Sequence, residues 1–368
     1  MQPRQQLTVA VNAWFAHSPH IGSGQYLIQL AAAIRQVTAD IAFEFVEPRS
    51  RNDLAKVAFE QNGFPRAVGR MKADVAFVPY WAPPLRCPAP IVCTVHDVIP
   101  LALPDYRGAL RHRLYSSLAR AATAGVQGIL TDSEHSKQDI VRLLPVASSR
   151  VAVVPLAADP TLTPNISNDE ATRVRTQYQL PEGYVLYLGG FDPRKNIETL
   201  LQVFTWCGET IGHEYILVIN GTEDTPVTTA AGARTTLGQL IQDLELADVV
   251  KLIGRVADED KRGVIALARC FLFTSTYEGF GLPPLEAMAC GVPIVGSNAS
   301  SLPEVVGNAG MLIEPMNARR MAGSVIAVCT DDELHDRLAQ RALLRAAQFS
   351  WQRTALETTA VLRNAHNP

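Results

Sequence analysis

The sequence predicts an α/β protein built from two doubly wound domains. Short apolar runs that fit buried strands alternate with segments of helical spacing, and several of these strands end in glycine-containing loops. With 368 residues, 47% of them hydrophobic, the chain is long enough for two separate cores. Residues 157–170 are rich in Pro, Asn, Asp and Thr and are the expected linker. We therefore expect an N-terminal domain at residues 1–165 and a C-terminal domain at residues 175–349.

The composition narrows the possible classes of function. The formal net charge is -3, which gives no electrostatic reason to expect nucleic acid as a partner. Six cysteines are scattered without a CxxC pair, so we expect a reducing cytoplasm and no structural zinc. The first residues carry no apolar signal core, and no stretch approaches the ~20 apolar residues of a membrane span.

The first predicted strand leads into a glycine-containing loop. Residues 7–12 fit a strand, and residues 25–35 have apolar side chains at helical spacing. Gly22 and Gly24 lie between them, where a doubly wound domain commonly binds a ligand. Leu27 occupies the place of the third glycine of the dinucleotide fingerprint, so NAD is not expected. A tight turn without a ligand is the alternative.

His96 and Asp97 follow another predicted strand. Residues 74–79 and 91–95 fit parallel strands, and ligands bind outside the carboxyl ends of such strands. His96 is therefore a candidate functional residue, with Asp97 as the group that orients it, and a structural histidine is the alternative. The rest of this domain is expected as a weakly patterned segment at 41–69, a strand and helix cap at 128–133, a helix to Leu144 and a last strand at 151–156.

Residues 106–124 are predicted to form a basic helix. The helix would carry Arg107, Arg111, Arg113 and Arg120 together with aromatic and aliphatic side chains. Such a helix could contact an anionic lipid surface or a phosphorylated acceptor. An ordinary solvated helix face is the alternative.

The second domain begins with a strand that delivers two cations. Residues 184–190 fit the strand, and Arg194 and Lys195 follow just before a helix that starts at Ile197. Arginine offers a planar fork for phosphate and lysine a mobile charge, so the pair suits a pyrophosphate. A solvated basic turn is the alternative. Later strands are expected at 215–221 and 249–256, with a long polar loop at 222–235 between them.

The stretch Tyr277–Pro293 combines a strand end, a glycine-containing loop and a helix start. Gly279 and Gly281 shape the loop, and the following prolines can open a helix. Backbone N–H groups and the helix dipole favour an anion at such a place. Glu278 and Glu286, with seven residues between them, are suited to accept hydrogen bonds from sugar hydroxyls. A phosphate flanked by two sugars indicates a sugar nucleotide; an ordinary loop acid and first-turn acid are the alternative.

These segments resemble family 4 of the retaining glycosyltransferases. The resemblance is carried by EGFGLPPLEAMACGVPIV, which contains the Glu-x7-Glu pattern, and is extended by TVHDVIPL and TDSEHSKQDI. It covers most of the chain. It implies the GT-B fold, in which two Rossmann-like domains face a deep cleft. It also implies that the last helix, residues 350–368, crosses back to complete the N-terminal acceptor domain, while residues 175–349 form the nucleotide-sugar donor domain.

The resemblance implies roles for individual residues. His96 would contact the donor sugar, and Lys195 would hold the diphosphate. Glu278 would contact the donor hexose, and Glu286 would accept hydrogen bonds from the ribose. The catalytic residues implied in this way are His96, Arg194, Lys195 and Glu278.

Further donor contacts follow from the same resemblance. Many family members carry an arginine where this chain has Gly190, and Arg194 is the candidate to replace it. The loop at Gly254 and Val256 would meet the nucleobase, largely through its backbone. The donor-binding residues implied are Gly22, Gly24, Gly190, Gly254, Val256, Gly279, Phe280, Gly281, Leu282 and Glu286.

The expected activity is transfer of a hexose from a nucleoside diphosphate sugar with retention of configuration. The segment SNASSLPEV resembles a loop common in bacterial surface-polysaccharide mannosyl- and rhamnosyltransferases, and on this resemblance GDP-mannose is the favoured donor. No Asp-x-Asp motif stands at a strand end, and no nucleophile is well placed, so neither a metal ion nor another cofactor is expected and a front-face mechanism is favoured. The acceptor would be a glycan or a lipid-linked sugar, and the protein would be cytoplasmic, with a peripheral contact at the inner face of the membrane as a further expectation.

Two other classes of function stay open on the sequence. A GT-B relative could epimerise or hydrolyse a sugar nucleotide instead of transferring the sugar. A protein that only binds nucleotide sugars is the third alternative, and the presence of His96, Lys195, Glu278 and Glu286 argues against it.

Overall fold

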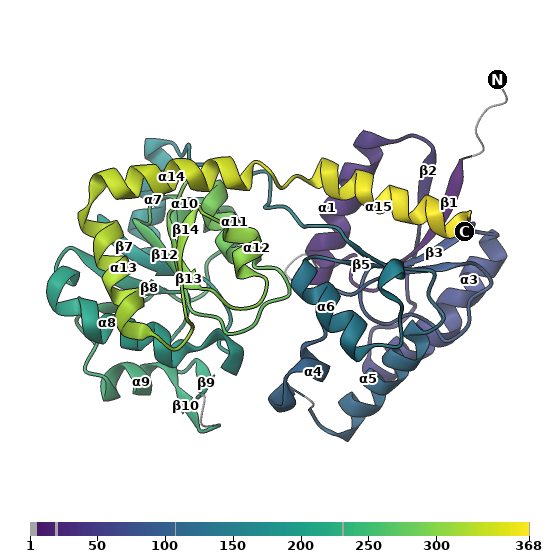
Figure 1. The fold of residues 1–368 in the computed structure, drawn as a ribbon, viewed down its shortest axis with the longest axis horizontal. Coiled ribbons are helices and arrows are strands. Elements are labelled where there is room, and N and C mark those ends of the chain that lie inside the picture. The colour runs from purple at the N-terminus through teal and green to yellow at the C-terminus, as the bar shows by residue number, and fades with distance from the viewer. Residues whose placement is uncertain (1–5, 19–20, 107, 230–231, 368) are drawn as a thin grey trace. The chain divides into compact units, whose positions relative to one another are not determined.

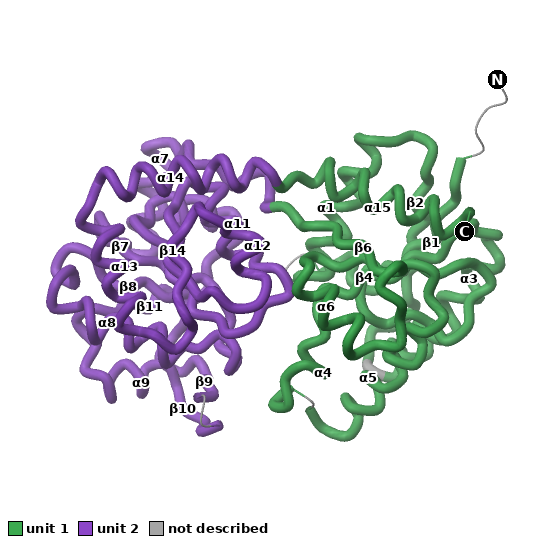
Figure 2. The backbone as a smooth tube through the Cα atoms, in the orientation of Figure 1, with its two compact units in different colours: residues 1–157, 349–368 green, residues 158–348 purple. Residues whose placement is uncertain are grey.

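The computed structural model describes residues 6–18, 21–106, 108–229 and 232–367. The chain forms two compact units (Figure 2). Unit 1 comprises residues 1–157 together with residues 349–368, and unit 2 comprises residues 158–348. The chain therefore leaves unit 1 once and returns to it after unit 2.

Unit 1 contains a six-stranded parallel sheet (Figure 1). The strands lie in the order β2-β1-β3-β4-β5-β6, so the chain changes direction across the sheet beside β1. The bounds are β1 Leu7–Asn12, β2 Ile41–Val46, β3 Val75–Val78, β4 Ile91–Thr94, β5 Gly128–Thr131 and β6 Val151–Val153.

Helices connect these strands and cover the sheet, as the doubly wound prediction requires. The α-helices are α1 Gly22–Val37, α2 Asp53–Ala58, α3 Phe64–Met71, α4 Ile99–Ala102, α5 Leu110–Thr123, α6 Glu134–Leu143 and α15 Trp351–His366. A π-helical turn, η1 Phe59–Gly63, joins α2 to α3, and 3-10 turns lie at η2 Pro104–Tyr106 and η3 Ser148–Arg150.

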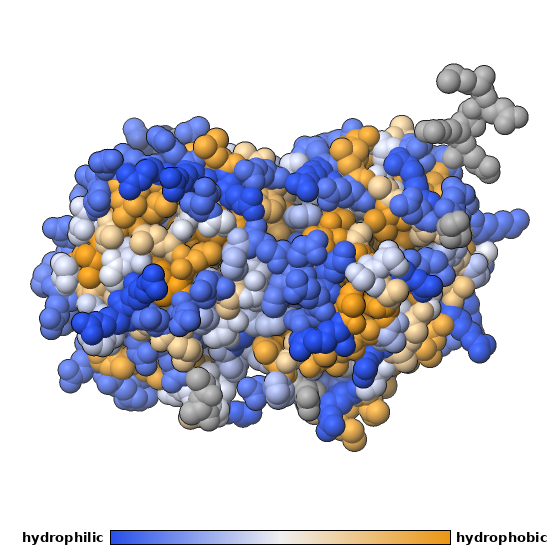
Figure 3. Space-filling model, in the orientation of Figure 1, coloured by the Kyte–Doolittle hydropathy of each residue, from blue (hydrophilic) through white to orange (hydrophobic). Residues whose placement is uncertain are grey.

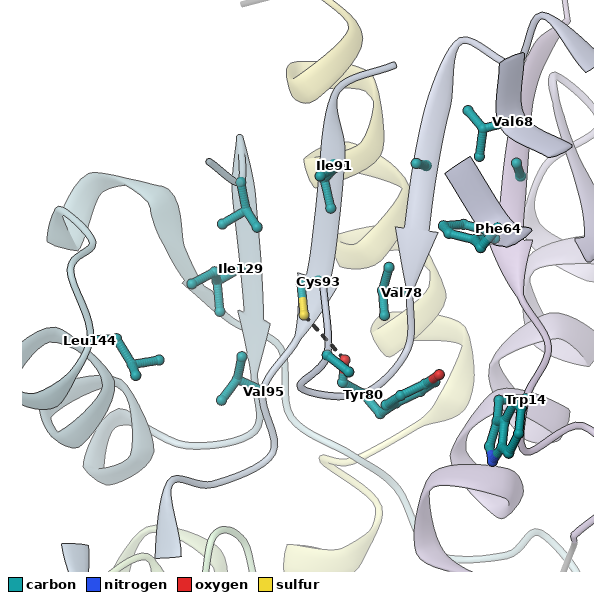
Figure 4. Packing of buried hydrophobic residues seen from close by; sticks show 14 of the residues in the cluster. Trp14, Phe64, Val68, Val78, Tyr80, Ile91, Cys93, Val95, Ile129 and Leu144 are labelled. Atoms are coloured by element: carbon teal, nitrogen blue, oxygen red, sulfur yellow. Dashed lines mark hydrogen bonds between the residues drawn. The ribbon is translucent and has the colours of Figure 1, made fainter. Parts of the chain in front are cut away.

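The core of unit 1 lies between the sheet and its helices. Val78, Cys93 and Ile129 project from the three central strands and are fully buried (Figure 4). Phe64 and Val68 come from α3, four residues apart, so they share one face of that helix. The strands β3, β4 and β5 are buried on both faces, as expected for a parallel sheet covered by helices.

Helix α15 packs within unit 1. The hydroxyl of Thr354 donates to the carbonyl of Pro155 at 2.6 Å, and the ring of Trp351 lies 6.3 Å from that of Tyr26 on α1. Leu362 is fully buried, but Leu356 is 54% exposed. Trp351 and Leu362 are therefore buried in unit 1, whereas Leu356 faces solvent.

Unit 2 contains a second six-stranded parallel sheet and a two-stranded antiparallel ribbon, β9 with β10. The six strands lie in the order β11-β8-β7-β12-β13-β14, which is the Rossmann order. The bounds are β7 Gly183–Tyr187, β8 Tyr215–Ile219, β9 Pro226–Thr228, β10 Arg234–Thr236, β11 Val250–Leu252, β12 Cys270–Phe273, β13 Ile294–Ser297 and β14 Gly310–Ile313.

Helices again alternate with the strands in unit 2. The α-helices are α7 Asn168–Tyr178, α8 Ile197–Ile211, α9 Leu237–Asp243, α10 Lys261–Ala266, α11 Leu282–Ala289, α12 Leu302–Val306, α13 Ala318–Thr330 and α14 Asp332–Ala346. The 3-10 turns are η4 Pro193–Lys195 and η5 Asp258–Asp260. Both sheets confirm the α/β, doubly wound fold class.

Several local predictions differ from the structure. The weakly patterned residues 41–69 contain β2, α2 and α3, and the polar loop 222–235 contains the ribbon strand β9 and the start of β10. The basic helix is shorter than expected, because α5 begins at Leu110 after a turn at Gly108 with a φ of 63°. Arg107 lies outside the described residues.

On the face drawn in Figure 3, hydrophilic side chains interrupt the hydrophobic surface in both units. Among the described residues, no helix combines the length and apolar character that crossing a bilayer requires.

Candidate active site

The strand order of unit 2 identifies one place where a ligand is expected. β7 pairs with β8 on one side and with β12 on the other, so the order reverses between β7 and β12. In open α/β sheets, ligands bind outside the carboxyl ends of the strands at such a switch point. The loops that leave β7 and β12 there carry Arg194, Lys195 and Glu278.

These three side chains form one ion-paired cluster. Lys195 Nζ donates to Glu278 Oε1 at 2.5 Å, and Arg194 Nη1 donates to Glu278 Oε2 at 2.7 Å. Arg194 also donates to the carbonyl of Tyr277 at 3.0 Å, and its Nε lies 3.1 Å from Asp192 Oδ1. Each carboxylate oxygen of Glu278 therefore has its own cation.

The cluster lies in a low-dielectric environment. The side chain of Lys195 is only 8% exposed, and its Nζ lies 5.1 Å from the centroid of the Phe273 ring. Burial would raise the pKa of Glu278, but the charges of Lys195 and Arg194 more than offset it, so the pKa is lowered. Burial lowers the pKa of Lys195, and the Glu278 carboxylate opposes that shift. Glu278 is thus held as a carboxylate between two cations.

The backbone around the two cations is fixed by hydrogen bonds between the loops. Asn196 adopts the left-handed conformation with a φ of 56°, and its amide donates to the carbonyls of Thr274 and Pro315. The hydroxyl of Thr274 in turn donates to the carbonyls of Lys195 and Asn196 at 3.0 and 3.1 Å. These bonds tie the loop after β7 to the strand end of β12, and so set where Lys195 points.

The loop from Tyr277 to Gly281 is supported by two serines that follow β13. Ser300 Oγ accepts from the backbone N–H of Glu278 at 2.8 Å. Ser301 Oγ donates to the carbonyls of Glu278 and Phe280 at 3.0 and 2.7 Å. Gly281 has a φ of 114°, at which any other residue would be strained, and it immediately precedes α11.

Glu286 lies on α11 and has a different partner. Lys261, at the start of α10, donates from Nζ to Glu286 Oε1 at 2.6 Å. The side chain of Glu286 is only 7% exposed, whereas that of Lys261 is 30% exposed. Burial raises the pKa of Glu286, and the charge of Lys261 offsets this only in part. The structure therefore pairs the two predicted carboxylates with separate cations.

The other predicted donor-binding residues of unit 2 lie on loops at strand ends and at the start of α11. Gly190 is exposed, and a side chain there would meet Asp192 and Lys195 at ordinary contact distance. Gly254 has a φ of 69° and open space around it, and Val256 is half-buried. Gly279 and Phe280 are buried, and Leu282 is half-buried. Their roles toward a donor stay predictions.

His96 in unit 1 is held by a carboxylate that we did not predict. Its Nδ1 lies 2.8 Å from Oδ2 of Asp132, which follows the neighbouring strand β5. The ring of Tyr26 contacts the imidazole edge to face, with centroids 4.8 Å apart. Asp97 instead accepts from the backbone N–H of Ile99 at 3.0 Å, at the start of α4. The expectation that Asp97 orients His96 is wrong.

Electrostatics favour the protonated form of His96. Burial lowers the pKa of His96, but the charge and hydrogen bond of Asp132, with smaller contributions from Asp97 and the carbonyl of Pro79, raise it overall. Burial raises the pKa of Asp132, which is only 3% exposed. The Nε2 atom of His96 is buried and makes no hydrogen bond of normal geometry with any described residue.

The two predicted glycines of unit 1 differ in their surroundings. A side chain at Gly24 would collide with the carbonyl oxygen of Ser18 at 2.1 Å, so this glycine allows α1 to pack against the preceding loop. Gly22 has open space around it. Pro19 and His20, between Ser18 and α1, lie outside the described residues.

Asp132, Lys261, Ser300 and Ser301 were missed as site residues. Asp132 follows a parallel strand, as His96 does. The expectation that ligands bind at the carboxyl ends of such strands would therefore also have identified Asp132 as a candidate. Lys261 gives no such signal, since its pairing with Glu286 depends on how α10 packs against α11. Within the described ranges, no group of three or more His, Cys, Asp or Glu side chains could hold a metal ion.

Comparisons with known proteins identify the family to which both units are similar. Residues 168–345 match the family model described as Glycosyl transferases group 1, and residues 22–162 match the model described as Glycosyltransferase Family 4. The second match spans most of unit 1, and the first spans most of unit 2.

Curated relatives include two proteins of Escherichia coli. The chain is 35% identical to O-antigen chain mannosyltransferase B over 268 residues, 73% of this chain and 68% of that protein. It is 27% identical to the serotype-specific mannosyltransferase WbdA over 342 residues, 88% of this chain and 40% of that protein. The chain thus corresponds to less than half the length of WbdA.

Solved structures share the fold over nearly the whole chain. Sucrose-phosphate synthase from Thermosynechococcus elongatus aligns with a TM-score of 0.74 at 19% identity, covering 98% of this chain and 99% of that one. WaaG, a glycosyltransferase involved in lipopolysaccharide biosynthesis, aligns with a TM-score of 0.70 at 16% identity, covering 96% and 98%. Both are similar to this chain in fold, with two Rossmann-like sheets of the GT-B type.

Proposed function

The chain belongs to the group 1, family 4 glycosyltransferases, and from that premise we propose that it transfers mannose from GDP-mannose to a glycan or lipid-linked acceptor. Two relatives are mannosyltransferases by name, which favours mannose over other hexoses. The resemblance of the SNASSLPEV segment favours the same donor, and within it Ser300 and Ser301 hold the loop that carries Glu278. The proposal further includes retention of configuration and independence from metal ions.

The observation that carries the proposal is the Arg194–Lys195–Glu278 cluster at the switch point of unit 2. When a sugar leaves a nucleoside diphosphate, negative charge develops on the β-phosphate. Arg194 and Lys195 would stabilise that charge, as preorganised cations do in a site with little water. They would also replace the metal ion that many sugar-nucleotide enzymes use for this purpose.

Glu278 requires a revised role in this proposal. We expected its carboxylate to accept hydrogen bonds from the hexose, but both of its oxygens already accept from cations. We propose that Glu278 holds Arg194 and Lys195 side by side before the donor arrives. Lys195 has three N–H donors, so it can keep Glu278 and still donate to a phosphate oxygen.

Glu286 and His96 keep the roles that were predicted for them. Glu286 would accept from the ribose hydroxyls, and its partner Lys261 is accessible enough to move as the ribose binds. His96, protonated and oriented by Asp132, would donate from Nε2 to a hydroxyl of the donor sugar. A front-face mechanism completes the proposal, with the acceptor hydroxyl entering on the face from which the diphosphate leaves.

Contact with an anionic membrane surface is a further part of the proposal. Helix α5 exposes Leu110 and Leu114 at 69% and 63%, beside the exposed Arg111, Arg113 and Arg120. Basic residues beside exposed leucines suit the interface of an anionic bilayer. Cosedimentation with phosphatidylglycerol vesicles tests this part; equal recovery with neutral phosphatidylcholine vesicles would contradict it. A cytoplasmic location, facing the inner leaflet, belongs to the same proposal.

The donor experiment measures nucleoside diphosphate release from GDP-, UDP-, dTDP- and ADP-sugars, with mannose-containing acceptors and with EDTA. Release from GDP-mannose that depends on the acceptor and is unaffected by EDTA supports the proposal. Rapid release without any acceptor would favour hydrolysis instead, whereas conversion of the donor into another nucleotide sugar without release would favour epimerisation. Release from another donor alone would overturn the GDP-mannose assignment, and loss of release in EDTA would overturn metal independence.

A further inference from the structure

A groove of about 680 Å³ opens in unit 1 at the carboxyl end of β2. Val46 and Phe59 contribute apolar surface to it. Three arginines also line it: Arg49 from the segment after β2, and Arg66 and Arg70 from α3. None of these three belongs to the residues discussed above, and they give the groove a strong positive charge.

The sequence of α3 explains why two of the arginines face the groove. Phe64 and Val68 point into the core of unit 1 (Figure 4). Arg66 follows Phe64 by two residues, and Arg70 follows Val68 by two residues. Each arginine therefore lies about 200° around the helix axis from the buried residue before it. They are four residues apart and so lie one above the other on the outer face. α3 therefore presents two guanidinium groups side by side.

The three guanidinium groups carry charge that the protein does not neutralise. None of them forms a hydrogen bond or an ion pair with another described residue. Glu47 also lines the groove, and its Oε1 lies 3.1 Å from Nε2 of His17; its carboxylate offsets one of the three guanidinium charges and leaves a net positive charge in the groove. Three like charges around one groove repel one another, and a bound anion would relieve that repulsion.

We propose that this groove binds the phosphate or diphosphate group of the acceptor substrate; the inference rests on the glycosyltransferase function proposed above. The planar fork of arginine matches phosphate oxygens with paired hydrogen bonds. Three cations are better balanced by a diphosphate, which carries at least two negative charges, than by a single carboxylate. The groove thus selects acceptors whose sugar is carried on a phosphate ester.

One end of the groove reaches the edge of the sheet where a ligand is expected. Val46, Glu47 and Arg49 lie at the carboxyl end of β2, the edge at which His96 follows β4. From there the groove runs along α3 to Arg70, near the end of the helix that leads to the amino end of β3. An acceptor whose phosphate is held in the groove would therefore have to extend past the carboxyl ends of the strands to present a hydroxyl near His96.

The test titrates inorganic pyrophosphate into the full chain in the presence of excess GDP, which occupies the proposed donor site. Calorimetry compares wild type with the double variant Arg66→Gln/Arg70→Gln and with the single variant Arg49→Gln. The matched control is Arg35→Gln/Arg86→Gln, which removes two exposed, unpaired arginines of unit 1 outside the groove. Circular dichroism and urea unfolding confirm that each variant is folded.

We expect the groove double variant to bind pyrophosphate at least about tenfold more weakly, because it loses charge-assisted hydrogen bonds, and Arg49→Gln to weaken binding in the same direction. The control variant should match wild type. Equal weakening in both double variants, or no pyrophosphate binding to wild type, would overturn the proposal. Malonate, a dicarboxylate of similar size, binding as tightly as pyrophosphate would overturn the phosphate assignment.

A second arm separates the two sources of a phosphate-bearing acceptor. Geranyl diphosphate and mannose 1-phosphate are titrated in the same way. Tighter binding of geranyl diphosphate, lost in Arg66→Gln/Arg70→Gln, identifies a lipid carrier, and tighter binding of mannose 1-phosphate identifies a soluble sugar phosphate. Failure of the proposed transferase function would appear separately, as absent GDP binding and absent donor turnover, and the difference between wild type and groove variants would still be measurable.

Discussion

Glu278 and Glu286 are almost equally buried, yet their surroundings shift their pKa values in opposite directions. Glu278 lies between Arg194 and the buried Lys195, and its pKa is lowered. Glu286 has a single partner, the partly exposed Lys261, and its pKa is raised. The comparison shows that burial alone does not set the pKa of a carboxyl group. The number of its cationic partners and how deeply they are buried determine whether the pKa is raised or lowered.

We propose that the same difference separates two functions. Each carboxylate oxygen of Glu278 accepts from a cation, so Glu278 would hold those cations in place for a diphosphate. Glu286 is paired with one cation that water can reach, so it would exchange that partner for a ribose hydroxyl. Three of the four experiments below test this division and one extends the comparison to Asp132; they are given in order of decreasing effect.

Replacing the two lysines should separate turnover from binding. Lys195→Met removes a cation that would stabilise the leaving diphosphate, and we expect turnover to fall by roughly 10²–10³-fold with a smaller change in donor binding. Lys261→Met should instead weaken donor binding more than it slows turnover. Steady-state nucleoside diphosphate release measures both quantities. Equal effects of the two variants on turnover would remove the distinction between the two regions.

Removing the Glu286 carboxylate should weaken the donor and the free nucleoside diphosphate together. We expect Glu286→Ala to raise both dissociation constants by about tenfold, because a buried acceptor of ribose hydrogen bonds is lost. Compared with Glu286→Ala, Glu278→Gln should have a smaller effect on the binding of free nucleoside diphosphate and a larger effect on turnover. Calorimetry gives the constants, with Glu209→Ala, an exposed acid on α8, as the control. Unchanged nucleotide affinity in Glu286→Ala would contradict the assignment.

A third buried carboxylate, Asp132, is paired with His96, whose own charge changes with pH. The pKa of His96 is raised above its ordinary value of about 6.5, so the pair stabilises the protein fully below that pH and loses its contribution as pH rises through the folded-state pKa. Asp132→Asn should lower the pKa of His96 in NMR titrations and cost on the order of 1–3 kcal/mol of unfolding free energy at pH 6, less at pH 8 and above.

Asp97→Asn is the matched control for that experiment, because Asp97 neighbours His96 in sequence but bonds to Ile99. It should shift the His96 titration less. A larger shift in Asp97→Asn than in Asp132→Asn would show that the wrong carboxylate had been assigned to the histidine.

The smallest expected effect is a change in unfolding free energy with pH, which should have opposite signs for Glu278 and Glu286. Glu278 has a lowered pKa, so its contribution to stability is present above the ordinary value of about 4.3 and is lost as pH falls through the folded-state pKa. Glu286 has a raised pKa, so its burial becomes less costly as pH falls.

Urea unfolding of Glu278→Gln and Glu286→Gln between pH 3.5 and 7 tests this. The difference in unfolding free energy between wild type and variant should rise with pH for Glu278→Gln and fall with pH for Glu286→Gln, each by at most about 1.4 kcal/mol per pH unit. Slopes of the same sign would mean that the two environments do not differ as described.

The sequence predicted most strands because central parallel strands are buried on both faces and appear as continuous apolar runs. β2, Ile41–Val46, was missed because it is an edge strand whose side chains are partly exposed, so its run is broken by Glu44. The strands β9 and β10 were missed because they are short, largely polar and partly exposed, so no apolar run marks them. The basic helix was predicted to begin too early, because the helical pattern of side chains continues before Leu110, where the backbone forms a turn at Gly108.

The candidate site was predicted residue by residue, but its pairings were not. Arg194, Lys195, Glu278 and Glu286 each gave a local signal of charge beside a glycine loop or helix start. That Glu278 pairs with both cations depends on β7 and β12 being neighbours, and their loops are more than 80 residues apart in the chain. The pairs His96–Asp132 and Glu286–Lys261 are likewise set by tertiary packing, which spacing along the chain does not encode.

Helix α15 has a consequence for the order in which the protein is made. Unit 2 is one continuous segment and can fold as soon as it has left the ribosome, whereas unit 1 lacks α15 until all of unit 2 has been synthesised. During that time the sides of α1 and β5 that α15 later covers face water. Nascent chains that pause before residue 351 therefore present an unfinished hydrophobic surface, the kind that chaperones bind and that aggregates form from.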